Sequence, residues 1–290
     1  MAEFFSALMQ HDFLQQALVA GLLASLGCGL MGPFVVVKRI TFLAGGIAHS
    51  VLAGMGAAVY FAFDPLLGAL VAAVVAALLI GWVRLYSEVR EDTTIGALWA
   101  IGMAVGILFI AGTPGYVTDL MSFLFGNILL VPRRELLFMA LLDGVLLISL
   151  TLFYRQFLAV AFDEEFARLR GVPVGLFYLA LLVLVAITVV LMIQVVGLIL
   201  VIALLTLPAA IAGLWTNSLA VMMLLATLLG ALLTSGGLAL SYGPDLPAGP
   251  TIIVLAGSAY FLALIGQRLL GKWWGSWSRN WSRNTRRRIQ

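Results

Sequence analysis

Nine apolar runs, each near the length needed to cross a lipid bilayer, constrain this 290-residue chain more than any other feature. A helix rises about 1.5 Å per residue, so about 20 apolar residues cover a hydrocarbon core of about 30 Å. Unpaired backbone polar groups are too costly in lipid, so each run is predicted to be helical. The runs lie at 13–37, 41–63, 66–86, 95–111, 136–154, 174–193, 196–214, 218–240 and 250–266. We expect an all-α transmembrane helix bundle of nine spans, or of eight if one run is re-entrant.

The composition excludes a water-soluble protein and several kinds of enzyme. Hydrophobic residues make up 63% of the chain and charged residues 10%, whereas a soluble domain carries about 25% charged residues.

The one cysteine, Cys28, cannot form an internal disulfide, and with two histidines it cannot complete a closed structural zinc site. Residues 266–273 resemble a phosphate-binding loop but place Trp273 where a hydroxyl must bind magnesium. We therefore expect no ATP site and no catalytic residues.

Loop charge predicts how the chain crosses the membrane. If nine spans start outside, 14 of the 16 lysine and arginine residues face the cytoplasm, and only Arg133 and Arg134 lie outside. Positive charge marks cytoplasmic loops, so the N-terminus is predicted to face out and the C-terminus to face the cytoplasm. A full span at 117–130 would reverse this pattern, so that segment is predicted to be interfacial or re-entrant. Residues 1–13 carry no lysine or arginine, which disfavours a secretory signal peptide.

Three regions follow from this pattern: an extracytoplasmic N-terminus at 1–12, a transmembrane domain at 13–266 and a basic cytoplasmic tail at 267–290. The tail mixes tryptophan with arginine. Such a mixture can bind RNA by stacking and charge, or it can form an aromatic belt and a basic segment against anionic lipid heads. We expect the lipid bilayer to be its partner, not nucleic acid.

A short helix is predicted inside the cytoplasmic loop 155–172. Acidic residues begin it and arginines end it, which suits the helix dipole, and Gly171 followed by Pro173 would stop it. A helix of this kind between two spans is either a docking surface for a cytoplasmic partner or an ordinary solvated loop. The candidate docking residues are Asp163, Glu164, Glu165, Ala167 and Gly171.

Three polar residues at the spans are candidates for a metal path. His49 lies near mid-membrane in the second run, and Asp143 lies deep in the fifth. Intramembrane ionisable groups are costly and usually functional, although a packing histidine or a helix-to-helix hydrogen bond would also explain them. Asp245 lies in an outer Pro/Gly turn, where it would receive a cation or shape the turn. The residues expected to serve helix packing are Gly45, Gly46, Gly54 and Pro208.

Six segments, in order along the chain, resemble signature elements of the ABC-3 permeases, the membrane subunits of bacterial zinc, manganese and iron importers. They are GPFVVVKRITFLAGGIAHSVLAG at 32–54, EDTTIGALWAIGMAVGIL at 91–108, FLFGNIL at 123–129, FDEEFARLRGVPV at 162–174, VVGLILVIALLTLPAAIAGL at 195–214 and GGLALSYGPDLPAGPTIIVL at 236–255. Each segment alone is a weak signal, but six in family order are highly specific.

The resemblance implies a homodimeric permease, similar to a type II ABC importer, in the bacterial plasma (inner) membrane. It also implies two cytoplasmic ATP-binding subunits, which hold ATP and Mg²⁺, and an extracytoplasmic metal-binding protein. Under this resemblance the loop 162–174 docks on the ATP-binding subunit and His49 lies on the metal path.

The sequence departs from the family pattern at Gly45. Many members carry an aspartate there, four residues before the histidine, where both side chains share one helix face. This chain lacks that carboxylate, so His49 would need partners from other helices, with Asp143 as a candidate. The affinity order of divalent metals favours Zn²⁺ as the transported ion, with Mn²⁺ or Fe²⁺ as alternatives.

Two other classes of membrane protein compete with the importer interpretation. A secondary carrier driven by an ion gradient would suit Asp143, but such carriers often show inverted repeats, and we find no repeat. A membrane-embedded enzyme would need paired catalytic residues, and the chain has no H-E-x-x-H motif.

Overall fold

The computed structural model describes residues 2–87, 91–113, 126 and 128–286, and all the regular elements in these ranges are helices. Nine of them are long and apolar enough to cross a membrane, which confirms the expected all-α bundle and its larger span number. The long helices are α2 (Asp12–Val37), α3 (Thr41–Tyr60), α4 (Pro65–Tyr86), α5 (Glu91–Ala111), α7 (Arg133–Phe162), α9 (Val174–Val196), α10 (Leu198–Trp215), α11 (Leu219–Tyr242) and α12 (Ala248–Arg286). The short ones are α1 (Ala2–Gln10), η1 (Ile128–Leu130) and α8 (Glu164–Leu169).

Helix α2 is the central element of the bundle. Every residue from 27 to 35 is buried, as expected of a helix that other helices surround. Glycines allow the close approach: a Cβ added at Gly29 would overlap Thr227 of α11, and one at Gly32 would overlap the carbonyl oxygen of Leu205 in α10. Side chains this small let helix backbones pack directly, which is the main source of association energy within lipid.

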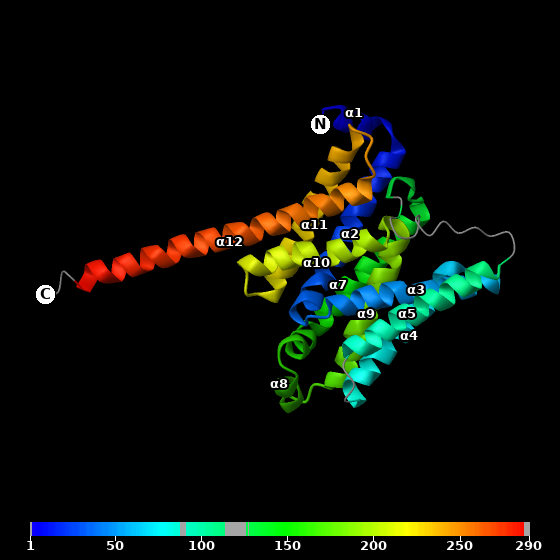
Figure 1. The fold of residues 1–290 in the computed structure, drawn as a ribbon, viewed down its shortest axis with the longest axis horizontal. Coiled ribbons are helices and arrows are strands. Elements are labelled where there is room, and N and C mark those ends of the chain that lie inside the picture. Colours follow the sequence, from blue (N-terminus) through cyan, green and yellow to red (C-terminus); the bar gives the residue numbers. More distant parts are fainter. Residues whose placement is uncertain (1, 88–90, 114–125, 127, 287–290) are drawn as a thin grey trace.

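Helices α3, α4 and α5 pack together beside this centre (Figure 1). A Cβ on Gly54 of α3 would overlap the carbonyl oxygen of Gly68 in α4. A Cβ on Gly56 would lie 2.5 Å from the carbonyl oxygen of Gly106 in α5. Helix α3 therefore touches both α4 and α5 backbone to backbone, and the three helices form one tightly packed unit.

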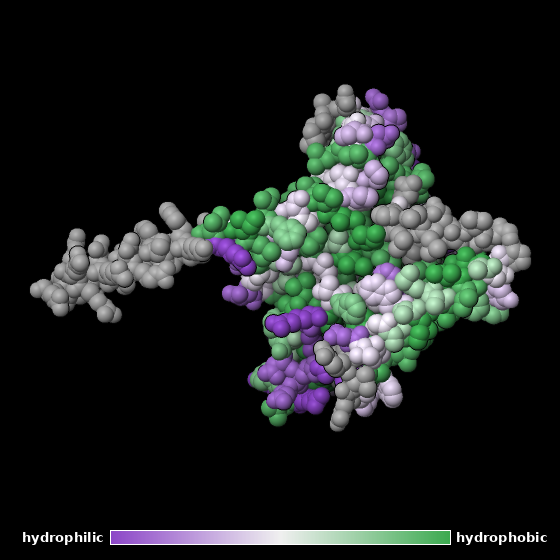
Figure 2. All heavy atoms as spheres, in the orientation of Figure 1, coloured by the Kyte–Doolittle hydropathy of each residue, from purple (hydrophilic) through white to green (hydrophobic). Residues whose placement is uncertain are grey.

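The outer surface has the pattern of a membrane protein. Hydrophobic residues cover broad areas of the helices, whereas hydrophilic residues gather around α8 and near α1 (Figure 2). Helices α1 and α8 lie at opposite ends of the molecule (Figure 1). An apolar exterior between two polar ends is the surface that a bilayer requires.

The structure shows three helical features that were not predicted from the sequence. Residues 2–10 form α1, and Phe4, which is 4% exposed, packs its ring edge against Tyr242. The segment 155–172 is mostly helical, because α7 continues to Phe162 past a kink at Phe153. Helix α12 runs on to Arg286, well beyond the expected end of the ninth span. Most of the expected interfacial segment at 117–130 lies outside the described residues.

Candidate functional site

Helix α8 is built as the sequence predicts, with an acid at its start and a glycine after its end. The carboxylate of Asp163 accepts a hydrogen bond from the backbone N–H of Phe166 at 2.9 Å, which caps the helix. Gly171 has φ 76°, a conformation that glycine adopts without strain, and it turns the chain toward α9. Ala167 is fully buried, whereas Leu169 is 87% exposed. One side of α8 is thus fixed to the bundle and the other is open to a partner.

Glu164 joins α8 to the transmembrane helices. It accepts a hydrogen bond from Lys38, the residue that ends α2, and Arg84 near the end of α4 lies 3.8 Å away. The Lys38 ammonium also lies over the ring of Tyr178 on α9, 5.6 Å from its centroid, within the range of a cation–π contact. Glu164 thus contacts the C-cap of α2 and the end of α4, and Lys38 extends this junction to α9.

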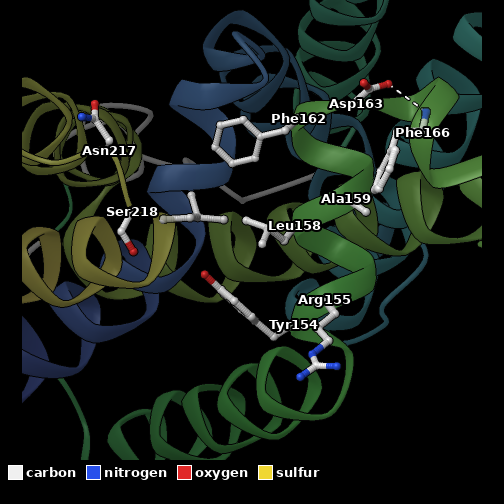
Figure 3. A pocket seen from close by; sticks show the side chains of 10 residues that line it. Tyr154, Arg155, Leu158, Ala159, Phe162, Asp163, Phe166, Asn217 and Ser218 are labelled. Carbon is white, nitrogen blue, oxygen red and sulfur yellow. Dashed lines mark hydrogen bonds between the residues drawn. The ribbon is translucent and has the colours of Figure 1, made fainter. Parts of the chain in front are cut away.

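A groove opens beside this junction (Figure 3). Side chains from the end of α7 line one side, and Asn217 and Ser218 from the turn between α10 and α11 line the other. Phe162 and Phe166 present their rings here and are 60% and 49% exposed. The lining residues are Tyr154, Arg155, Leu158, Ala159, Phe162, Asp163, Phe166, Asn217, Ser218 and Leu219. Exposed aromatic rings with a polar rim are the features of a protein-docking surface.

His49 is buried in α3 with one ring nitrogen engaged. Its Nδ1 lies 2.8 Å from the carbonyl oxygen of Gly45, and a carbonyl only accepts, so Nδ1 carries the proton. In neutral imidazole the other nitrogen, Nε2, then bears a lone pair, and it makes no hydrogen bond within the described part of the chain. One face of the ring is stacked on Trp99 of α5, with centroids 4.0 Å apart and planes 19° apart. His49 is thus an oriented imidazole with a free ligand nitrogen.

Asp143 lies on α7, where this helix packs against α2 and α9. It is 2% exposed, and neither carboxylate oxygen has a hydrogen-bond partner among the described residues. A Cβ added at Gly27 of α2 would lie 2.7 Å from Asp143 Oδ1 and 2.8 Å from the methyl carbon of Met192. An unpaired buried carboxylate costs free energy, so its retention needs an explanation. The suggested partnership of Asp143 with His49 stays a prediction.

The candidate residues do not converge on one ligand cluster. Over the described ranges, no three His, Cys, Asp or Glu side chains lie close enough to share a metal ion. Asp245 lies in the exposed turn before α12, with φ 56°. His49, Asp143 and Asp245 are therefore separate polar positions and do not form one closed metal site within the described residues.

Two residues of this site were not identified from the sequence. The sequence indicates Lys38 only as a positive loop charge directly after a span, and the structure shows that it pairs with Glu164 of α8. Trp99 lies inside the family-like segment 91–108, and only the packing of α5 on α3 shows that its ring meets His49. The sequence pattern of a single helix does not predict which residues of other helices its side chains contact.

Comparisons with known proteins agree with this architecture. A family model described as the ABC 3 transport family matches residues 10–267. The chain is 48% identical to an uncharacterized membrane protein of Synechocystis sp. over 92% of this chain and 95% of that protein. It is 35% identical to the manganese transport system membrane protein MntC of Halalkalibacterium halodurans over 93% of this chain and 94% of that one.

A solved structure, PsaBC from Streptococcus pneumoniae in complex with Fab, is similar with a TM-score of 0.81 and 32% identity. The match covers 90% of this chain and 94% of that chain. The fold, the order of the sequence motifs and the nearly full-length family match lead to one conclusion: the chain belongs to the ABC 3 transport family.

Proposed function

We propose that this chain is the membrane-spanning subunit of an ATP-driven importer of divalent transition-metal ions. The observation that carries this proposal is the match to the ABC 3 transport family over residues 10–267, which includes eight of the nine candidate spans in full and all but the end of the ninth. The oriented imidazole of His49 inside α3 supports it, because a free imidazole nitrogen is a common ligand for such ions.

The energy would come from separate subunits that hydrolyse ATP in the cytoplasm, one on each protomer of a homodimer. The proposed contact surface is α8 with the adjacent groove, since Phe162, Phe166 and Leu169 are exposed there. Asp163, Glu164, Glu165, Ala167 and Gly171 would then form or shape the docking helix. An extracytoplasmic metal-binding protein would deliver the ion at the opposite end.

The proposed orientation places α8 in the cytoplasm and α1 outside. The ion pairs of Glu164 show that Lys38 and Arg84 lie at the α8 end of the bundle. Positive residues mark the cytoplasmic side, so the charge distribution supports an outward N-terminus. Asp245 lies in the turn between α11 and α12, which in this orientation faces the incoming ion.

In the proposed cycle, the ion passes His49, with Asp143 acting farther along the protein interior. ATP binding would move α8, and the ion pair of Glu164 with Lys38 would transmit that movement to α2 and α3. The transport path would then change from outward-open to inward-open. Gly46, Gly54 and Pro208 would maintain the close helix packing through this change.

Zinc is the first candidate ion, for a reason that lies in α3. Carboxylate oxygens suit manganese, whereas imidazole suits zinc, and α3 offers His49 with Gly45 in place of a carboxylate. Manganese is the second candidate, because the relative from Halalkalibacterium halodurans is named a manganese transport protein.

The test is uptake by the complete complex in proteoliposomes. The chain would be purified with its ATP-hydrolysing subunit, and uptake of zinc, manganese and iron would be measured with loaded binding protein outside. We expect metal accumulation that requires ATP and both subunits, with zinc fastest. Transport by the chain alone, driven by an ion gradient, would overturn the proposal in favour of a secondary carrier.

A further inference from the structure

Trp99 of α5 makes aromatic contacts with the neighbouring helix α3. Trp99 is only partly buried, and its ring contacts two residues of α3 that lie about two helical turns apart. The indole is stacked on His49 at 4.0 Å between centroids and is tilted against Phe42 at 5.7 Å. Phe42, Gly45 and His49 are spaced by three and four residues, so they share one face of α3.

The stack is held by the backbones of the two helices. A Cβ on Gly102 of α5 would lie 2.6 Å from the Cα of Ser50, so the helices are in direct contact one turn from the stacked rings. The hydroxyl of Ser50 lies 3.2 Å from the carbonyl oxygen of Leu98, the residue before Trp99. These contacts hold the backbone of α5 close to that of α3 at the level of Trp99.

Two restraints together fix the imidazole of His49. The hydrogen bond from Nδ1 to Gly45 O determines the tautomer and holds the Nδ1 edge of the ring in place. The stacked indole determines the orientation of the ring plane. A metal ion binds Nε2 in the plane of the ring, so a partner on the ring face does not block it. The indole also lies beside Gly45: its Cζ3 would lie 3.8 Å from a Cβ there, which is an ordinary van der Waals contact.

We propose that Trp99 is the positioning residue of the metal path: its indole holds the His49 imidazole so that Nε2 meets the passing ion. This inference rests on the proposed function of His49 as a station for the ion. It assigns to an aromatic face the orienting role that a hydrogen-bonded carboxylate performs at many histidine sites.

The experiment compares Trp99→Phe and Trp99→Leu with the wild-type complex. Phenylalanine retains a flat face, so its KM for zinc uptake should stay within about twofold of wild type. Leucine removes the stack and should raise KM about three- to tenfold, the range expected from the energy of an aromatic pair, with ATP hydrolysis unchanged. A purely structural role would instead lower the maximal rate and the yield of folded protein in both variants. Equal KM values in all three proteins would overturn the proposal.

A second readout uses the indole itself. Co²⁺ added to the complex in nanodiscs should quench tryptophan fluorescence, and Trp99→Phe should lose most of this change. The control is Trp82→Phe on α4, because Trp82 is 58% exposed and packs against Tyr86 instead. Quenching that persists in Trp99→Phe but disappears in Trp82→Phe would contradict the inference. If the wild-type complex transports no metal ion in the uptake assay, the proposed function itself fails, and the two failures are therefore distinct.

Discussion

Glu164 at the start of α8 is paired with Lys38 at the end of α2, so the predicted docking helix is tied to the central helix of the bundle. Both side chains are largely shielded, at 13% and 23% exposure, and a shielded pair is screened less by salt than an exposed one. The next residue, Arg39, has φ 59° and leads through Ile40 into α3, the helix that carries His49. A displacement of α8 therefore reaches α3 through a short, directly bonded route.

Lys38→Met should uncouple ATP hydrolysis from metal uptake. The change leaves Glu164 partly shielded with a weaker partner, at a cost of about 1 kcal/mol or more, so coupled uptake should fall at least about fivefold. ATP hydrolysis by the complex should continue. Arg133→Met is the matched control, because the Arg133–Asp12 pair is 79% and 78% exposed. Uptake at the wild-type rate in Lys38→Met proteoliposomes would show that the pair transmits nothing.

His49→Ala should lower zinc uptake by at least about tenfold, since it removes the free Nε2 from the path. Binding of the ATP-hydrolysing subunit should be unchanged, because His49 is buried in α3 and is not part of the proposed docking surface on α8. The other histidine, His11, is exposed before α2, so His11→Ala serves as the control. Metal uptake and co-purification of the ATP-hydrolysing subunit would be measured for both variants and for the wild-type protein. Normal uptake by His49→Ala would remove this residue from the mechanism.

Gly45→Asp should shift ion preference toward manganese. A Cβ at this position would meet only ordinary contacts, at 3.8 Å from Trp99 and 3.9 Å from Ile202, so a side chain fits. The new carboxylate would lie one turn from His49 and would add the oxygen ligand that manganese prefers. Competition between zinc and manganese in the uptake assay measures the change, with Gly45→Asn as a neutral control of similar size. An unaltered zinc-to-manganese ratio would show that position 45 does not set selectivity.

The sequence predicts the helical bundle well because span length and hydrophobicity are local properties. The nine spans and the short helix at Glu164–Leu169 follow from runs, caps and stop signals along the chain. The length of α12 does not follow from the sequence pattern: tryptophan and arginine in the tail indicate a membrane boundary, but neither residue type stops a helix. Helix formers dominate residues 2–10, which is consistent with the formation of α1.

The site was predictable only in part, for a physical reason. His49 and Asp143 stand out as ionisable groups in apolar runs, which a single sequence reveals. The stack of Trp99 on His49 and the pair of Lys38 with Glu164 join residues 50 and 126 positions apart. Such pairs depend on which helices become neighbours, and many helix arrangements satisfy the same pattern of apolar runs.

Asp143→Asn should stabilise the isolated protein and impair transport. The substitution replaces an unpaired buried carboxylate by a neutral group of similar size, which should raise the free energy of unfolding by about 1 kcal/mol or more. If Asp143 serves the metal path, zinc uptake should fall in the same variant. Thermal unfolding in detergent and uptake in proteoliposomes measure the two effects. Asp64→Asn is the control, because Asp64 is an exposed N-cap and asparagine caps equally well. A less stable Asp143→Asn protein would show that the carboxylate has a favourable partner in the folded state.

Gly54→Ala should loosen the packing of α3 on α4. Its methyl group would overlap the carbonyl oxygen of Gly68 and lie 2.6 Å from the Cβ of Ala72, so the helices must separate. Overpacking of this kind costs about 1–3 kcal/mol, more than the helix propensity gained by alanine. Gly257→Ala on α12 is the matched control: nothing lies within 4 Å of its added Cβ, and it should stabilise by up to about 1 kcal/mol. Thermal unfolding in detergent should therefore move in opposite directions for the two variants. A higher unfolding temperature for Gly54→Ala would mean that α3 and α4 are not in backbone contact at this position.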